Sequence, residues 1–185
     1  MRIVGGALRG RALSGPRSQA IRPTSDRLRE SVFDILAHRF SDPVTGANVV
    51  DLFAGAGALG LEALSRGAAR ALFIDDGAEA RALLRANIEA LGLGGVTRIF
   101  RRDATKLGAA PPGEQFSLAF LDPPYGKDLA KLALAALIDG GWLAPGAVVV
   151  VEESAKAQVE LPQNLLREDE RRYGDTQFIF ARYAC

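Results

Sequence analysis

The chain has 185 residues, 48% of them hydrophobic and 24% charged, with a formal net charge of +1. This composition suits one soluble domain with a full core, and no apolar run reaches the roughly 18 residues of a membrane span. Cys185 is the only cysteine, so an intrachain disulfide and a cysteine-based zinc site are excluded. We therefore expect no metal, no membrane and a reducing cytoplasm as the location.

The first part of the chain is basic. Residues 1–40 hold eight arginines against three acids, a net charge of +5, which leaves −4 for the rest. A basic arm on a mildly acidic body suggests a polyanionic partner, and a solvated arginine-rich surface is an equal alternative. We divide the chain into this extension and a body over residues 41–185.

The extension contains two predicted elements. A Gly-Gly pair between "RIV" and "RGRALS" predicts a hairpin over residues 2–13. A Ser/Pro/Arg-rich link follows. From Thr24 to His38 apolar residues recur at i, i+4, i+7 and i+8, which predicts a helix that Thr24 or Ser25 can cap.

In the body, short apolar runs alternate with helical patterns. Strands are predicted over 47–53, 71–75, 96–101, 116–122 and 147–153, and helices over 59–67, 78–91 and 127–139. Near-continuous apolar strands in such a series predict a parallel sheet with helices on both faces. Two last strands within 165–183 flank a turn at Gly174 and Asp175, and their short connection makes them antiparallel.

A glycine loop follows the first strand of the body. Gly55, Gly57 and Gly60 form a G-x-G-x-x-G motif, and Asp75 lies at the end of the next strand, where a carboxylate can bind ribose hydroxyls. Both NAD and S-adenosylmethionine meet this description. Asp51 favours S-adenosylmethionine, because a carboxylate complements its sulfonium and ammonium groups and would repel a pyrophosphate. The alternative is that Asp51 caps the following turn.

A further acid follows the third strand. Asp103 is placed to accept the adenine amino group, unless it is a loop carboxylate in water. Together with their neighbours, these residues make a predicted donor site of Asp51, Phe53, Gly55, Gly57, Gly60, Asp75, Asp76, Asp103 and Ala104.

The fourth strand ends in Asp-Pro-Pro-Tyr. Pro123 and Pro124 lack the N–H that a ladder needs, so Asp122 stands at the carboxyl edge of the sheet, where ligands bind in open α/β folds. The Asp122 carboxylate and the Pro123 carbonyl can accept hydrogen bonds from an exocyclic base amine, and Asp122 can act as a general base. Tyr125 offers a stacking face to a flipped base. A tight turn without chemistry is the alternative.

The order of these motifs resembles the bacterial 16S ribosomal RNA guanine-N2 methyltransferase family over nearly the whole chain. The matching stretches are "MRIVGGALRGRAL", "RPTSDRLRESVFDIL", "VVDLFAGAGALGLEALSRGA", "LDPPYG" and "RRYGDTQF". The resemblance implies the α/β, Rossmann-like class I methyltransferase fold, a doubly wound seven-stranded sheet of order 3-2-1-4-5-7-6 with strand 7 antiparallel. It also implies methylation of one guanine of 16S ribosomal RNA, with S-adenosylmethionine as donor and S-adenosylhomocysteine as product. We expect the RNA to be part of a small-subunit particle, with free RNA as the alternative, and the composition is compatible with a monomer.

The resemblance also assigns roles to residues. The donor loop falls on residues 51–60, the ribose acid on Asp75, and the catalytic motif on residues 122–125. "FIDDGAEA" departs from the expected acid-x-acid pattern, so Asp76 is a second candidate for the ribose. The predicted contacts with RNA phosphates are Arg2, Arg9, Arg11, Arg22, Arg27 and Arg29.

Three alternatives remain open at this point. An adenine-N6 DNA methyltransferase would share the same motifs, although such enzymes usually need a separate target-recognition region. An NAD-dependent dehydrogenase would explain the glycine loop and leave residues 122–125 without a role. An RNA-binding module without catalysis would not need an intact donor loop.

Overall fold

The structure is a computed structural model that describes residues 1–16 and 24–184. Its elements are α1 (Asp26–Arg39), β1 (Asn48–Leu52), α2 (Ala58–Ser65), β2 (Arg70–Ile74), α3 (Ala78–Leu91), the short 3-10 helix η1 (Gly94–Val96), β3 (Thr97–Phe100), β4 (Phe116–Leu121), α4 (Leu129–Asp139), β5 (Leu143–Ser154), β6 (Leu165–Tyr173) and β7 (Thr176–Tyr183). The helices and strands predicted from residue 24 onward are all present, and β5 begins earlier than predicted, at Leu143.

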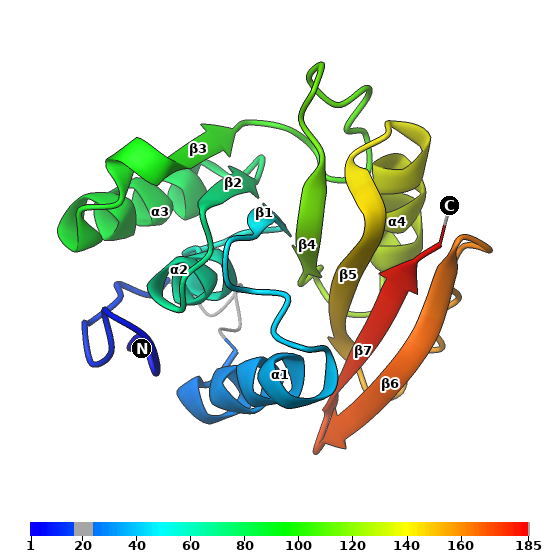
Figure 1. Cartoon of the computed structure of the whole chain (residues 1–185), viewed down its shortest axis with the longest axis horizontal. Helices are drawn as coiled ribbons and strands as arrows, with labels where there is room; N and C mark the ends of the chain where they lie inside the picture. The colour runs from blue at the N-terminus through cyan, green and yellow to red at the C-terminus, as the bar shows by residue number, and fades with distance from the viewer. Residues whose placement is uncertain (17–23, 185) are drawn as a thin grey trace.

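The seven strands form one sheet of order β3-β2-β1-β4-β5-β7-β6 (Figure 1). The pairs from β3 to β5 are parallel, whereas β7 runs antiparallel to both of its neighbours. The predicted strand order and the antiparallel end are therefore confirmed. The carboxyl ends of β1, β2, β3 and β4 lie at one edge, which is where the predicted site residues follow in sequence.

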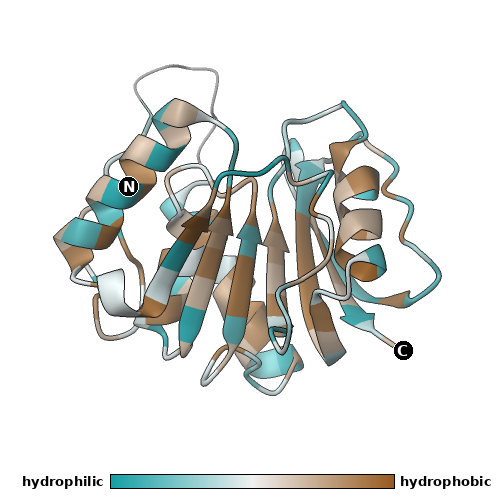
Figure 2. Cartoon of the chain, turned by 90° about the horizontal axis from the view of Figure 1, so that it is seen from above, coloured by the Kyte–Doolittle hydropathy of each residue, from teal (hydrophilic) through white to brown (hydrophobic). Residues whose placement is uncertain are grey.

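Helices cover both faces of the sheet, with α1, α2 and α3 on one side and α4 on the other (Figure 1). Each face has its own core. Phe33, Leu61 and Leu84 pack against one side, and Leu134 and Trp142 pack against the other. The central strands are correspondingly hydrophobic along much of their length (Figure 2). Among the described residues, no helix is long and apolar enough to cross a membrane.

The N-terminal segment is less regular than the predicted hairpin. Within residues 1–16, the strand-like pairing is limited to a single antiparallel bridge between Arg2 and Ala12. The loop between them docks on the end of α2, where the Ala7 N–H donates to the Ser65 carbonyl at 2.8 Å. A Cβ on Gly6 would lie 2.0 Å from that carbonyl oxygen, so the Gly-Gly pair permits this close approach and does not form a two-residue turn.

A buried carboxylate in α2 ties the N-terminal segment to the rest of the molecule. Glu62 has no exposed surface and accepts hydrogen bonds from the backbone N–H groups of Val4 and Gly5, both at 2.9 Å. Ile3 and Leu13 belong to the same core as α1 and α2. Residues on the two sides of position 40 thus share one hydrophobic core.

Candidate functional site

A cavity opens at the carboxyl edge of the sheet. It is lined by the last residue of β2 and by residues that follow β1, β2, β3 and β4: Phe53, Ile74, Asp75, Asp76, Arg102, Asp103, Ala104, Pro124 and Leu129. The topology explains this convergence, since four parallel strands deliver their following loops to one edge. The cavity brings together the predicted residues Phe53, Asp75, Asp76, Asp103 and Ala104 and adds Pro124 from the Asp-Pro-Pro-Tyr motif.

Asp75 connects the cavity to the glycine loop. One carboxylate oxygen accepts the N–H of Gly55 at 2.9 Å, and the other accepts the N–H of Gly77 at 2.8 Å. Asp76 is exposed and lines the same cavity without these two contacts. The carboxylate of Asp75 therefore has a fixed direction, which a ribose-binding acid requires.

Asp103 is held in a local turn. Its Oδ1 accepts hydrogen bonds from the Thr105 hydroxyl at 2.7 Å and the Thr105 N–H at 2.8 Å. These bonds lower the pKa of Asp103, the hydroxyl contributing most, so the group is an ionised acceptor beside the buried Ala104.

The described residues contain no group of three or more His, Cys, Asp or Glu side chains that could hold a metal ion.

Asp51 is buried beneath the glycine loop. Only 1% of its surface is exposed, and its Oδ2 accepts the N–H of Gly60 in the first turn of α2 at 3.0 Å. Burial raises the pKa of Asp51 to about 8, the negative charge of Asp75 adds to this, and the bond from Gly60 opposes it. Asp51 thus caps α2 from the preceding strand, the role that the sequence left as the alternative.

The glycines of the loop are required by packing. A Cβ on Gly57 would lie 2.3 Å from Leu84 Cδ1, and a Cβ on Gly60 would lie 2.4 Å from Phe73 Cε1. Both contacts bring α2 close to its neighbours, so two of the three motif glycines serve helix packing. Phe53 has a positive φ of 57°, which is uncommon for a non-glycine residue and turns the chain sharply after β1.

Asp122 follows β4, and its N–H donates to the Leu52 carbonyl of β1 at 3.4 Å. The residue is half-buried. Burial raises the pKa of the Asp122 carboxyl well above its usual value, and the charge and hydrogen bond of Glu152, with smaller effects of Asp51 and Glu153, raise it further. Asp122 is thus one of several acids gathered at this edge of the sheet.

Tyr125 is anchored through its hydroxyl. The hydroxyl lies 2.9 Å from Thr176 Oγ1 and 3.3 Å from Glu152 Oε1. The sequence interpretation gave this hydroxyl no role and missed both partners. The available signal was in "AVVVVEE", where two acids end an otherwise apolar strand at the same edge of the sheet as Asp122.

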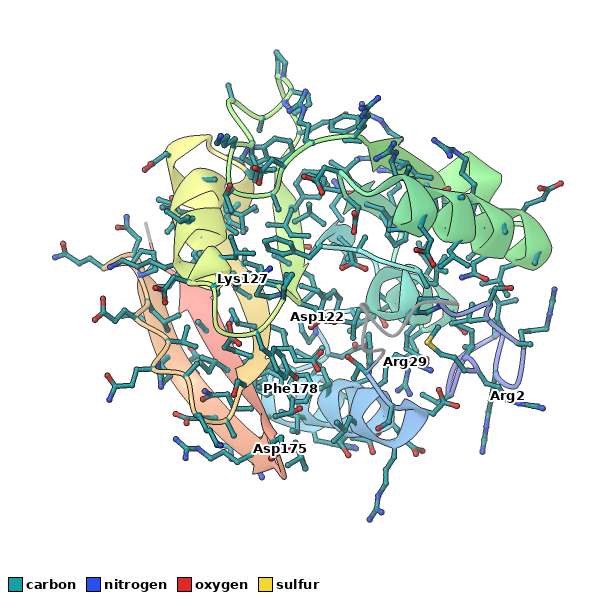
Figure 3. All side chains as sticks on the ribbon, turned by 180° about the vertical axis from the view of Figure 1, so that it is seen from behind. Arg2, Arg29, Asp122, Lys127, Asp175 and Phe178 are labelled. Carbon is teal, nitrogen blue, oxygen red and sulfur yellow. The ribbon has the colours of Figure 1, made fainter. Side chains whose placement is uncertain are left out.

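Arg29 is the one candidate RNA contact that the structure contradicts. Its side chain has no exposed surface, and it donates to Glu62 at 3.1 Å and to Asp26 at 2.8 Å. A guanidinium enclosed in this way cannot reach a phosphate, so the predicted role is wrong and Arg29 is a core residue. Figure 3 shows Arg29 inside the molecule and Arg2 at its rim.

Four of the other candidate arginines have exposed side chains: Arg2, Arg9, Arg11 and Arg27. Arg11 also donates to the Ala90 carbonyl at 2.6 Å, which ties it to the end of α3. Arg22 lies outside the described residues.

Replacement of Asp75 tests the donor site. We expect Asp75→Ala to weaken binding of S-adenosylhomocysteine by roughly 10- to 150-fold, because hydrogen bonds to a charged acceptor contribute about 1.5–3 kcal/mol. Asp76→Ala is the matched control and should change the affinity little. Isothermal titration calorimetry measures the affinity of both variants. A larger loss of affinity in Asp76→Ala would indicate that Asp76 binds the ribose instead of Asp75.

Comparison with known proteins gives concordant matches. The family model described as conserved hypothetical protein 95 matches residues 1–182. Ribosomal RNA small subunit methyltransferase D of Escherichia coli strain K12 is 41% identical over 84% of this chain and 76% of its own length. A putative rRNA methyltransferase of Bacillus subtilis, YlbH, is 35% identical over 89% of this chain and 88% of its own. The solved structure of the putative methyltransferase yhhF from Escherichia coli superposes with a TM-score of 0.84 at 33% identity, over 100% of this chain and 98% of its own.

Proposed function

The chain belongs to the conserved hypothetical protein 95 family, and from this premise we propose that it is an S-adenosylmethionine-dependent methyltransferase of small-subunit ribosomal RNA. We propose further that the methyl group goes to the exocyclic N2 amine of one guanine and that the enzyme acts as a monomer without a metal. One observation carries the proposal. The cavity that holds Asp75 and Asp103 is bounded by Pro124, so the donor site and the Asp-Pro-Pro-Tyr loop adjoin.

The cavity suits the adenosine part of the donor. Phe53, Ile74 and Ala104 offer apolar surface for a purine ring, and the carboxylates of Asp75 and Asp103 offer acceptors for hydroxyl and amino groups. When bound, S-adenosylmethionine supplies an electrophilic methyl group. A nearby cation would also favour the ionised form of Asp51, whose pKa of about 8 otherwise keeps it largely neutral at pH 7.

The Asp-Pro-Pro-Tyr loop supports transfer to an exocyclic amine. Such an amine is a poor nucleophile because its lone pair is delocalised into the ring. An ionised Asp122 and the carbonyl of Pro123 can accept its two hydrogens, which fixes the amine and favours a more pyramidal nitrogen. The nitrogen must lose one proton, and the Asp122 carboxylate can take it. Tyr125, held by Thr176 and Glu152, can stack on the flipped base.

Methyl transfer from a tritiated donor tests the function directly. Small subunits that lack the modification should be labelled, and digestion should place the label on N2 of one guanine. Label on an adenine N6 in DNA would replace the proposal with the alternative enzyme. Absence of transfer to any nucleic acid, with donor binding intact, would refute the proposed activity.

The exposed arginines should bind RNA through phosphates. Arg9→Ala and Arg27→Ala should each reduce the slope of log affinity against log salt by roughly 0.7 on single-stranded RNA. Lys131→Ala is the matched control, since Lys131 is an exposed cation that pairs with Glu160 beyond the basic arm. Filter binding over a salt series measures the slopes. An equal change in the control would assign the effect to overall charge.

A further inference from the structure

Glu152 lies beside the proposed catalytic carboxylate. Leu121 at the end of β4 pairs with Val151 of β5, so the next residues along these parallel strands, Asp122 and Glu152, are neighbours. Glu152 is 4% exposed. It is thus a buried acid at the carboxyl edge of the sheet, within the part of the molecule where the base must enter.

The Glu152 carboxylate joins distant parts of the chain. Its Oε2 accepts the Thr24 hydroxyl, just before α1, at 2.5 Å, and its Oε1 accepts the Tyr125 hydroxyl at 3.3 Å. The Tyr125 hydroxyl also meets Thr176 of β7. These contacts fix the far end of the tyrosine ring, which sets the plane that a base could stack on.

We propose that Glu152 is a positioning residue for methyl transfer, which orients Tyr125 and controls through its charge whether Asp122 meets the amine as a carboxylate. This role rests on the proposed function, and in it Glu152 acts through Asp122 and Tyr125. Because Asp122 and Glu152 follow paired residues of adjacent strands, the negative charge of Glu152 opposes ionisation of Asp122, which must be a carboxylate to accept the amine's hydrogens.

Burial and several acids together oppose ionisation of Asp122. Burial is the largest cause of its raised pKa, followed by Glu152 of β5 and then by Asp51 of β1 and Glu153 of β5. Burial also raises the pKa of Tyr125 to about 12, so its hydroxyl stays protonated and can donate to Glu152. Loss of the Glu152 charge should lower the pKa of Asp122 and thus allow ionisation at lower pH.

Glu152→Gln tests the charge while preserving the size of the side chain. We expect the rate of single-turnover methyl transfer by the wild type to rise with pH along one limb of the profile, as Asp122 ionises above the usual range of an aspartate. In Glu152→Gln this limb should move by about one unit or more toward acid, because a neighbouring negative charge is gone. Glu153→Gln is the matched control, since Glu153 is equally buried and has the weakest effect on Asp122, and its limb should move much less.

Tyr125→Phe separates the two roles of Glu152. It removes the hydroxyl that Glu152 holds and leaves both acids in place, so the rate with RNA should fall while the limb keeps its position. Should Glu152→Gln fail to fold, Glu152→Ala removes the same charge and carries the same expectation for the limb.

A titration of the free protein, without substrate, tests the same effect of Glu152 on the pKa of Asp122. Carboxyl ¹³C NMR of the free protein labelled at aspartate should show Asp122 titrating at lower pH in Glu152→Gln than in the wild type. An unchanged Asp122 midpoint, or an equal shift in Glu153→Gln, would overturn the inference. Because this measurement needs no methyl transfer, an inactive wild type would refute the proposed function without deciding the role of Glu152.

Discussion

We expect Asp122→Ala to lower the single-turnover rate of methyl transfer by about 10²- to 10⁴-fold, the range that general acid–base groups usually contribute. The substitution removes the carboxylate that we propose as acceptor of the amine's hydrogens and as the base that takes its proton. Donor affinity should stay close to that of the wild type, because Asp122 does not line the cavity that contains Asp75 and Asp103. Rapid-quench measurement with saturating donor and RNA gives the rate.

A second acid of the same loop provides the control. Asp128 is exposed, just before α4, and its side chain makes no capping hydrogen bond. Asp128→Asn should therefore leave the rate near the wild-type value. A wild-type rate in Asp122→Ala would show that the loop is structural and that the chemistry lies elsewhere.

The largest loss of stability is expected from Glu62→Ala. This carboxylate has no exposed surface and accepts from Arg29 Nε at 3.1 Å, Arg66 Nε at 2.9 Å and two backbone N–H groups. Its removal leaves the guanidinium of Arg29 without its buried counter-charge, and the carboxylate of Asp26 that stays beside it is partly exposed. Breaking a buried pair in this way costs about 3–5 kcal/mol in the free energy of unfolding.

Urea denaturation measures this change in the free energy of unfolding. Asp26→Ala is the matched control, because Asp26 pairs with the same Arg29 but its side chain is 41% exposed. That exposed pair should contribute less than about 1 kcal/mol. Equal losses in the two variants would mean that burial of the Glu62 pair does not determine its contribution.

The strand order and the edge that carries the site could be predicted from sequence, because both follow from local patterns. Near-continuous apolar strands that alternate with helices define a parallel sheet, and prolines after Leu121 mark where a strand must end. Once the sheet is parallel, Asp75, Asp103 and Asp122 are brought to one edge without any knowledge of tertiary contacts.

The errors involve contacts that no local pattern encodes. Arg29 looks like the other arginines of the arm in sequence, and its pairing with the buried Glu62, 33 residues further along the chain, forms only in the folded protein. The donor role of Asp51 stays a prediction, and the structure adds a hydrogen bond from the Gly60 N–H to its carboxylate. Glu152 was missed because its neighbours Thr24 and Tyr125 are separated from it in sequence and meet it only in the folded protein.

The contacts around Glu152 join residues that are far apart in the sequence, which has a consequence for folding during synthesis. Thr24 and Glu152 are 128 residues apart in the chain, and Tyr125 and Thr176 are 51 residues apart. The residues that line the cavity, from Phe53 to Leu129, are all translated before β5 and β7. Since synthesis proceeds from the N-terminus, a growing chain contains the proposed donor-binding residues before the strands that hold the Tyr125 hydroxyl. In the proposed mechanism, Tyr125 therefore reaches its anchored position only after β5 and β7 have left the ribosome.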